Sequence, residues 1–120
     1  MNEQESALGD LVRVLGESAA RIRELEAEAQ RVVDKDPEAY KDLLKDKCRE
    51  LKALPERAAP HLEELGERGL AIGEELEDFA GRASMALNVD SVFFMYALLY
   101  PEDYKPGEPN DLEVFIKGLA

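Results

Sequence analysis

The most regular apolar pattern of the chain lies in His61–Leu87, HLEELGERGLAIGEELEDFAGRASMAL. Apolar and small residues recur through it at alternating steps of three and four: Leu62, Leu65, Gly69, Ile72, Leu76, Phe79, Ala83 and Ala86. This is the a/d spacing of a helix that packs along one seam, and such a helix would be roughly 39 Å long. The stretch therefore predicts one long helix over about residues 60–87.

Glycine is unusually frequent in this stretch, with four glycines between residues 66 and 81. Each glycine costs a helix about 1 kcal/mol relative to alanine, so their presence requires a structural reason. Gly66, Gly73 and Ala80 form a row of small residues beside the seam, and Gly69 lies in the seam itself. We predict that these four residues allow a second helix to pack closely.

The composition favours one helical domain over residues 1–120. Hydrophobic residues make up 45% and charged residues 35%, which with heptad spacing is typical of helical proteins. The net charge of −12 repels phosphate groups and anionic lipids, so we expect no nucleic acid and no membrane among its partners. The first residues do not resemble a signal peptide, no apolar run reaches the roughly 20 residues of a membrane span, and Cys48 is the single cysteine. We expect a cytoplasmic protein.

Apolar periodicity and helix-capping residues predict two helices in the first half of the chain. The first helix is expected over about residues 6–34, and Asp36 with Pro37 predicts the start of a second helix over 37–54. Pro55 and Pro60 follow, although the heptad spacing continues through both of them. A break or sharp kink without reversal is favoured here over one continuous helix, and whether the chain reverses at this point stays open.

The second half ends in a short apolar segment and a tail. The run VFFMYALLY, residues 92–100, has no polar face and predicts a buried helix over about 91–100. The loop 101–110 follows with three prolines, and Asn110 with Glu113 resembles a capping box for a last helix over 111–119. The predicted fold is all-α, a long antiparallel helical hairpin or three-helix bundle with coiled-coil-like heptads and a short C-terminal helical appendage.

The apolar surface of the C-terminal third predicts self-association. One neighbouring helix cannot cover a segment that is apolar on every side, and a monomer rarely leaves such a patch exposed. We expect a homodimer whose interface includes Val92, Phe93, Phe94, Tyr96, Leu99, Leu112, Phe115, Ile116 and Leu119. The alternative is a monomer in which splayed helices enclose residues 92–100 completely.

A cluster of glutamates is the one candidate for metal chemistry. Glu63, Glu64 and Glu67 form EExxE, and carboxylates at this spacing share a helix face that can hold Mg²⁺ or Mn²⁺. The motif resembles the first metal motif of the MazG-type helical nucleotide pyrophosphohydrolases. That family also has an ExxD motif on a following helix, whereas Glu75 and Asp78 provide it here on the same predicted helix.

The sequence therefore supports two functional hypotheses. The first is a non-catalytic helical interaction protein, such as a small oligomeric scaffold, adaptor or chaperone-like module, with no cofactor and no catalytic residues. The alternative is a metal-dependent nucleotide pyrophosphohydrolase-like enzyme that uses Glu63, Glu64, Glu67, Glu75 and Asp78. His61 has no histidine or cysteine at ligand spacing, which argues against zinc. Cys48 lies on a predicted seam, which favours a buried structural thiol.

Overall fold

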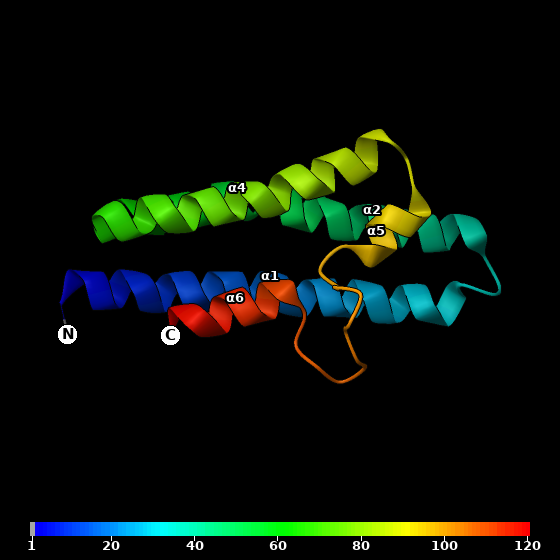
Figure 1. Cartoon of the computed structure of the whole chain (residues 1–120), viewed down its shortest axis with the longest axis horizontal. Coiled ribbons are helices and arrows are strands. Elements are labelled where there is room, and N and C mark those ends of the chain that lie inside the picture. The colour runs from blue at the N-terminus through cyan, green and yellow to red at the C-terminus, as the bar shows by residue number, and fades with distance from the viewer. Residues whose placement is uncertain (1) are drawn as a thin grey trace.

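A computed structural model describes residues 2–120, and every regular element in this part of the chain is a helix (Figure 1). The all-helical class predicted from the sequence is confirmed. The helices are α1 (Glu3–Val32), α2 (Pro37–Lys52), α3 (Leu54–Leu62), α4 (Gly66–Asn88), α5 (Val92–Ala97) and α6 (Asp111–Leu119), and the short 3-10 helix η1 (Glu63–Leu65) joins α3 to α4. None of the described helices is both long enough and apolar enough to cross a membrane.

Helix α1 runs along most of the longest dimension of the molecule, which measures 51 × 29 × 24 Å (Figure 1). It begins at Glu3, earlier than the sequence predicts, because the Asn2 side chain accepts a hydrogen bond from the backbone N–H of Glu5 at 2.7 Å. Its buried side runs through Leu11, Leu15 and other apolar residues at steps of three and four. This one helix therefore supports α2, α3 and α6.

Helices α2 and α3 run back along α1 as a nearly continuous path (Figure 1). Asp36 caps α2 through its side chain, and Pro37 occupies the first turn. The only interruption between the two helices is Ala53. Pro55 lies in the first turn of α3, where its missing N–H leaves no hydrogen bond unmade, and Pro60 lies inside that helix. The chain therefore breaks before the prolines and does not reverse at them.

The chain reverses at η1 instead, which corrects the prediction of one helix over residues 60–87. Helix α3 ends at Leu62, and Gly66 turns the backbone with φ 60° and ψ −130° before α4 returns along α3. This positive φ favours glycine, since a Cβ atom would crowd the carbonyl oxygen. The heptad spacing gave no sign of the turn because Leu65 stays buried in the core through the reversal.

Helices α1, α2, α3 and α4 pack together around one apolar core. Its side chains come from all four helices, and α5 and α6 add Met95, Leu112 and Leu119 to it. Cys48 is fully buried in this core, and burial raises the pKa of its thiol. A buried thiol with a raised pKa has little thiolate at neutral pH, which suits a structural residue.

The two short C-terminal helices dock at different places. Helix α5 packs on α2 and α4, and it ends at Ala97 rather than at residue 100. Helix α6 lies beside α1, where Phe115 meets Phe79 of α4 edge to face with ring centroids 5.8 Å apart (Figure 1). The backbones of α5 and α6 do not approach each other closely. The tail helix therefore docks along α1 rather than over α5.

Candidate functional site

The carboxylates of the EExxE and ExxD motifs are spread over two elements. Glu63 and Glu64 lie in η1, Glu67 lies in the first turn of α4, and Glu75 and Asp78 lie farther along α4. All five are exposed to solvent. Within residues 2–120 no three acidic, histidine or cysteine side chains are placed to hold a metal ion. The reversal at η1 separates residues that a continuous helix would have aligned, so the structure does not assemble this candidate site.

The four small residues that were expected to allow close helix packing lie in different environments. A Cβ atom on Gly69 would lie 2.1 Å from the carbonyl oxygen of Leu62, and one on Gly73 would lie 3.5 Å from Leu62 Cδ1. Ala80 is buried. A Cβ atom on Gly66 would meet nothing within 4 Å, so the prediction of close packing is wrong there. Gly66 allows the turn between η1 and α4 through its positive φ. Gly69 has no side chain, which allows the end of α3 to pack directly against α4.

The residues expected at a dimer interface divide into buried and exposed sets. Leu99, Leu112 and Leu119 are buried in the chain's own core. Three more are only partly buried and pack against that core: Val92, Phe115 and Ile116. Phe93, Phe94 and Tyr96 are exposed by 71%, 54% and 54%. The exposed three all lie on α5, so only this part of the predicted interface remains available to a partner.

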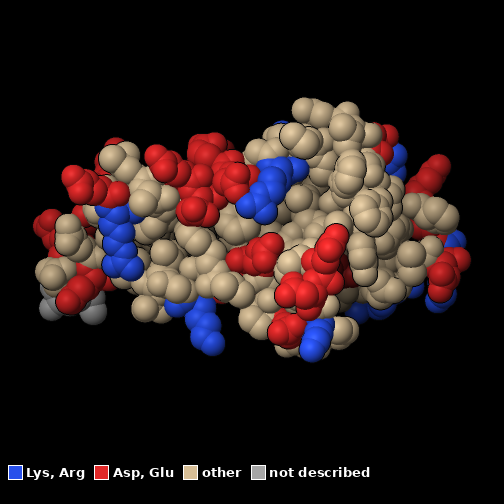
Figure 2. All heavy atoms as spheres, viewed as in Figure 1, with Lys and Arg blue, Asp and Glu red and all other residues tan. Residues whose placement is uncertain are grey.

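Two residues at the end of α4 extend this exposed surface. Met85 and Val89 are exposed by 68% and 54%. We call these two residues, together with Phe93 and Phe94, whose ring centroids lie 5.8 Å apart, the apolar patch. Figure 2 shows a broad uncharged area over α5 and the end of α4, whereas acidic groups gather elsewhere on the same face.

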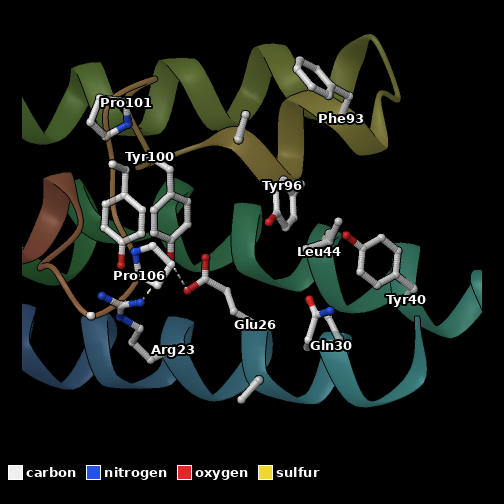
Figure 3. A pocket seen from close by; sticks show the side chains of 15 residues that line it. Arg23, Glu26, Gln30, Tyr40, Leu44, Phe93, Tyr96, Tyr100, Pro101 and Pro106 are labelled. Carbon is white, nitrogen blue, oxygen red and sulfur yellow. Dashed lines mark hydrogen bonds between the residues drawn. The ribbon is translucent and has the colours of Figure 1, made fainter. Parts of the chain in front are cut away.

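A cleft beside α5 contains all four tyrosines of the chain (Figure 3). Tyr40 comes from α2, Tyr96 from α5, and Tyr100 and Tyr104 from the loop that follows. Phe93 lies where this tyrosine cleft meets the apolar patch. The cleft has a volume of about 890 Å³, within the range of ligand-binding sites in proteins.

The segment between α5 and the loop is fixed by a buried lysine. Lys47 is completely buried, and its Nζ atom donates to the carbonyl oxygens of Tyr96 at 3.2 Å and Leu98 at 2.9 Å. The same atom pairs with Glu26 at 3.0 Å. Burial lowers the pKa of Lys47, and the neighbouring Glu26 carboxylate opposes that effect. Lys47 thereby joins α2, α1 and the end of α5.

Tyr100 is the most constrained of the four tyrosines. Its hydroxyl donates to Glu26 Oε1 at 2.6 Å and accepts from Arg23 Nη1 at 3.2 Å (Figure 3). Its ring packs edge to face against Tyr104 with centroids 4.7 Å apart, and Lys47 Nζ lies 5.1 Å from the ring centroid. Burial raises the pKa of Tyr100, and Glu26 raises it further. The Tyr100 hydroxyl therefore stays protonated at neutral pH, and its ring is held in place on this side of the cleft.

Arg23 also holds the tail helix against α1. Its Nη2 and Nε atoms donate to Glu113 Oε1 at 2.6 Å and Oε2 at 3.2 Å, and Nη2 reaches the Glu108 carbonyl oxygen at 3.2 Å. Glu113 Oε1 also accepts from the backbone N–H of Asn110, which completes the capping box of α6. The guanidinium holds the pKa of the Glu113 carboxyl below its ordinary value. One ion pair thus fixes both the loop and α6.

We predict that Glu113→Gln lowers stability by about 1 kcal/mol at pH 7, since it removes a bidentate but half-exposed ion pair. The pKa of Glu113 is lower in the folded protein than its ordinary value of 4.5 in the unfolded chain. The charged carboxylate therefore stabilises the folded protein above about pH 4.5, and this stabilisation is lost as the pH falls through the lower pKa of the folded state. Urea unfolding should therefore show a smaller gap between the two proteins in acid, well below pH 4.5, than at pH 7. An equal gap at both pH values would contradict the role of this charge.

Sequence reasoning missed the lysine and the arginine that build the cleft. Lys47 follows Leu44 by three residues and precedes Leu51 by four, so it occupies the apolar side of α2. A charged residue at such a position is a signal of a buried polar contact. Arg23 carries no comparable signal, because its partner Glu113 lies 90 residues away in the sequence.

No family model, no curated protein and no solved structure matches this chain.

Proposed function

We propose that this chain is a non-catalytic helical interaction protein that binds a second copy of itself through the apolar patch. The observation that carries the proposal is the run of exposed apolar side chains on α5 and the end of α4. In the proposed arrangement, α1, the α2–α3 path and α4 form an antiparallel three-helix scaffold with heptad-like seams. The single buried Cys48 suits a reducing compartment, so we propose a cytoplasmic location.

The exposed area leaves room for a dimer of ordinary size. The chain exposes 7419 Å², whereas a compact monomer of 13.4 kDa is expected to expose about 6,500 Å². Its elongated shape accounts for a surplus of this kind. The difference of roughly 900 Å² is comparable to the ~800 Å² that each partner contributes to a standard interface. Pairing through the patch would bring the exposed area per chain close to the value for a compact protein.

Charge supports the choice of this surface over others. Two molecules with a net charge of −12 each repel one another over most of their surfaces. The four patch side chains are uncharged, and two of them are phenylalanines, which are enriched at the centres of interfaces. A two-fold contact places the same patch on both sides. Nothing in the described residues favours the metal-dependent hydrolase, whose carboxylates lie apart.

We predict that Phe94→Glu weakens self-association at least about tenfold, because it places a carboxylate at the centre of an apolar contact. The side chain is 54% exposed within one chain, so the fold itself should tolerate the change. Light scattering across a concentration series should show a lower mass for the variant, with an unchanged helical circular dichroism spectrum.

Leu70→Glu is the matched control for this experiment. Leu70 is 72% exposed and lies on the same helix as Met85, but it lies outside the patch. The control should keep the mass of the unmodified protein. If the two variants lower the mass equally, the effect comes from added charge alone and the patch is not the interface.

A further inference from the structure

The tyrosine cleft has the chemistry of a binding site for a second kind of partner. It lies between α1, α2, α5 and the loop 98–110, and aromatic rings line it from three of these segments (Figure 3). We infer that it binds an extended, proline-rich peptide segment that carries basic residues. This inference goes beyond self-association, because the cleft contains Tyr40 and Tyr104, which are not part of the apolar patch.

Aromatic rings are the first feature that selects proline. Tyr40, Tyr96 and Tyr104 line the cleft, and two proline rings of the loop, Pro101 and Pro106, complete its wall. Flat rings of this kind pack against proline in an extended polyproline II helix, which enters such a groove already ordered. A segment of that shape loses little conformational entropy on binding.

Hydroxyl groups are the second feature. The hydroxyls of Tyr100 and Tyr104 are already used, the first by Glu26 and the second by the Glu108 carbonyl oxygen at 2.7 Å. Among the described residues, the hydroxyls of Tyr40 and Tyr96 make no hydrogen bond. Because a polyproline II segment makes no internal hydrogen bonds, its carbonyl oxygens are free to accept from these two donors.

Rigidity is the third feature, since a preformed site binds more tightly than a flexible one. Lys47 holds the carbonyl oxygens of Tyr96 and Leu98, so the end of α5 is fixed against α2. Glu26 and Arg23 hold Tyr100 from the opposite side. The two walls of the cleft are therefore positioned by buried and half-buried polar contacts before any ligand arrives.

Charge complementarity decides which proline-rich segments fit. The loop 101–110 carries three acidic residues, Glu102, Asp103 and Glu108, and one basic residue, Lys105, which gives a charge of −2. All four are exposed, and they alternate with the residues that line the cleft. Figure 2 shows acidic groups gathered over this loop. Arg23, the one cationic residue of the lining, is already paired with Glu113, and the buried Lys47 behind it is paired with Glu26. The surroundings therefore favour lysine or arginine beside the prolines.

The inference is tested with three labelled peptides of equal length, made of Lys-Pro-Pro, Lys-Ala-Ala and Glu-Pro-Pro repeats. Fluorescence anisotropy with the full chain should show binding of the first peptide and at least about tenfold weaker binding of the other two. Binding of the first peptide should weaken as salt rises, because the charges that attract it are exposed. No binding of the Lys-Pro-Pro peptide, or equal binding of the Lys-Ala-Ala peptide, would overturn the inference.

Substitutions of cleft residues test whether the peptide binds in the tyrosine cleft. Tyr96→Ala and Tyr40→Ala should each weaken binding about tenfold, and Tyr40→Phe should weaken it less because the ring remains. Leu70→Ala, far along α4, should bind as the unmodified protein does. Tyr96 is 54% exposed, so its truncation should leave the helical spectrum unchanged. Unchanged affinity in folded Tyr96→Ala would show that the peptide binds elsewhere and would contradict the inference.

The same variants separate this inference from the proposed function. Phe94→Glu should lose self-association and keep peptide binding, whereas Tyr40→Ala should lose peptide binding and keep self-association. If Tyr40→Ala and Tyr96→Ala instead lower the light-scattering mass while no peptide binds, the cleft holds a second copy of the chain. That result would overturn the peptide inference and leave self-association in place.

Discussion

Gly69→Ala is expected to destabilise the protein by about 3 kcal/mol, although alanine is the better helix former. The added Cβ would lie 2.1 Å from the carbonyl oxygen of Leu62, which is backbone at the end of α3 and cannot move as a side chain can. Overpacking of this kind typically costs 1–3 kcal/mol, and a clash with backbone belongs at the upper end. For a domain of this size, the melting temperature should fall by roughly 10 °C.

Gly81→Ala provides a control within the same helix. A Cβ atom at residue 81 would meet nothing within 4 Å, so only the helix preference of alanine should act, with a gain of up to about 1 kcal/mol. Thermal and urea unfolding of the two variants should therefore shift in opposite directions. A gain in stability for Gly69→Ala would mean that α3 and α4 are not in close contact at this residue.

Lys47→Met is expected to cost about 3–5 kcal/mol, because it leaves one member of a buried ion pair without its partner. Lys47 is completely buried, and the Glu26 side chain that it pairs with is 17% exposed. The variant also leaves the carbonyl oxygens of Tyr96 and Leu98 without their donor. Urea unfolding followed by circular dichroism measures the loss, and the tyrosine cleft should lose its fixed geometry at the same time.

Two further variants show whether burial is the cause. Lys41→Met, on the same helix, removes a surface pair with Asp90 in which both side chains are exposed to solvent, so it should cost far less than Lys47→Met. Adding Glu26→Gln to Lys47→Met should recover part of the loss, because the unpaired carboxylate is then gone. Equal losses for Lys41→Met and Lys47→Met would contradict the account of the buried pair.

The helices could be predicted from the sequence because local signals define them. Asp36 with Pro37 and Asn110 with Glu113 are cap signals that act within one turn, and the structure has a helix start at both places. The sequence did not reveal the reversal at Gly66, because the apolar residues keep the same three-and-four spacing on both sides of the turn. A glycine in a regular seam is equally consistent with close packing, as at Gly69, and with a turn, as at Gly66.

The sites were less predictable because they depend on contacts between distant residues. The surplus of apolar residues in 92–100 pointed to α5, yet Leu99 is buried while Phe93 is exposed, and composition alone does not divide them. The tyrosine cleft brings together Tyr40 and Tyr100, which are far apart in the sequence. No short sequence pattern therefore predicts it. Met85 and Val89 lie outside the heptad positions of α4, and only the structure shows how far each is exposed.

The molar mass of the unmodified protein in solution shows whether the chain self-associates as we propose. Light scattering or sedimentation equilibrium should be carried from low to high micromolar concentration at physiological salt. We predict that the mass rises from 13.4 kDa toward twice that value as concentration increases. Phe94→Glu should remain near 13.4 kDa over the same range. A mass of 13.4 kDa for the unmodified protein at every concentration would contradict the claim.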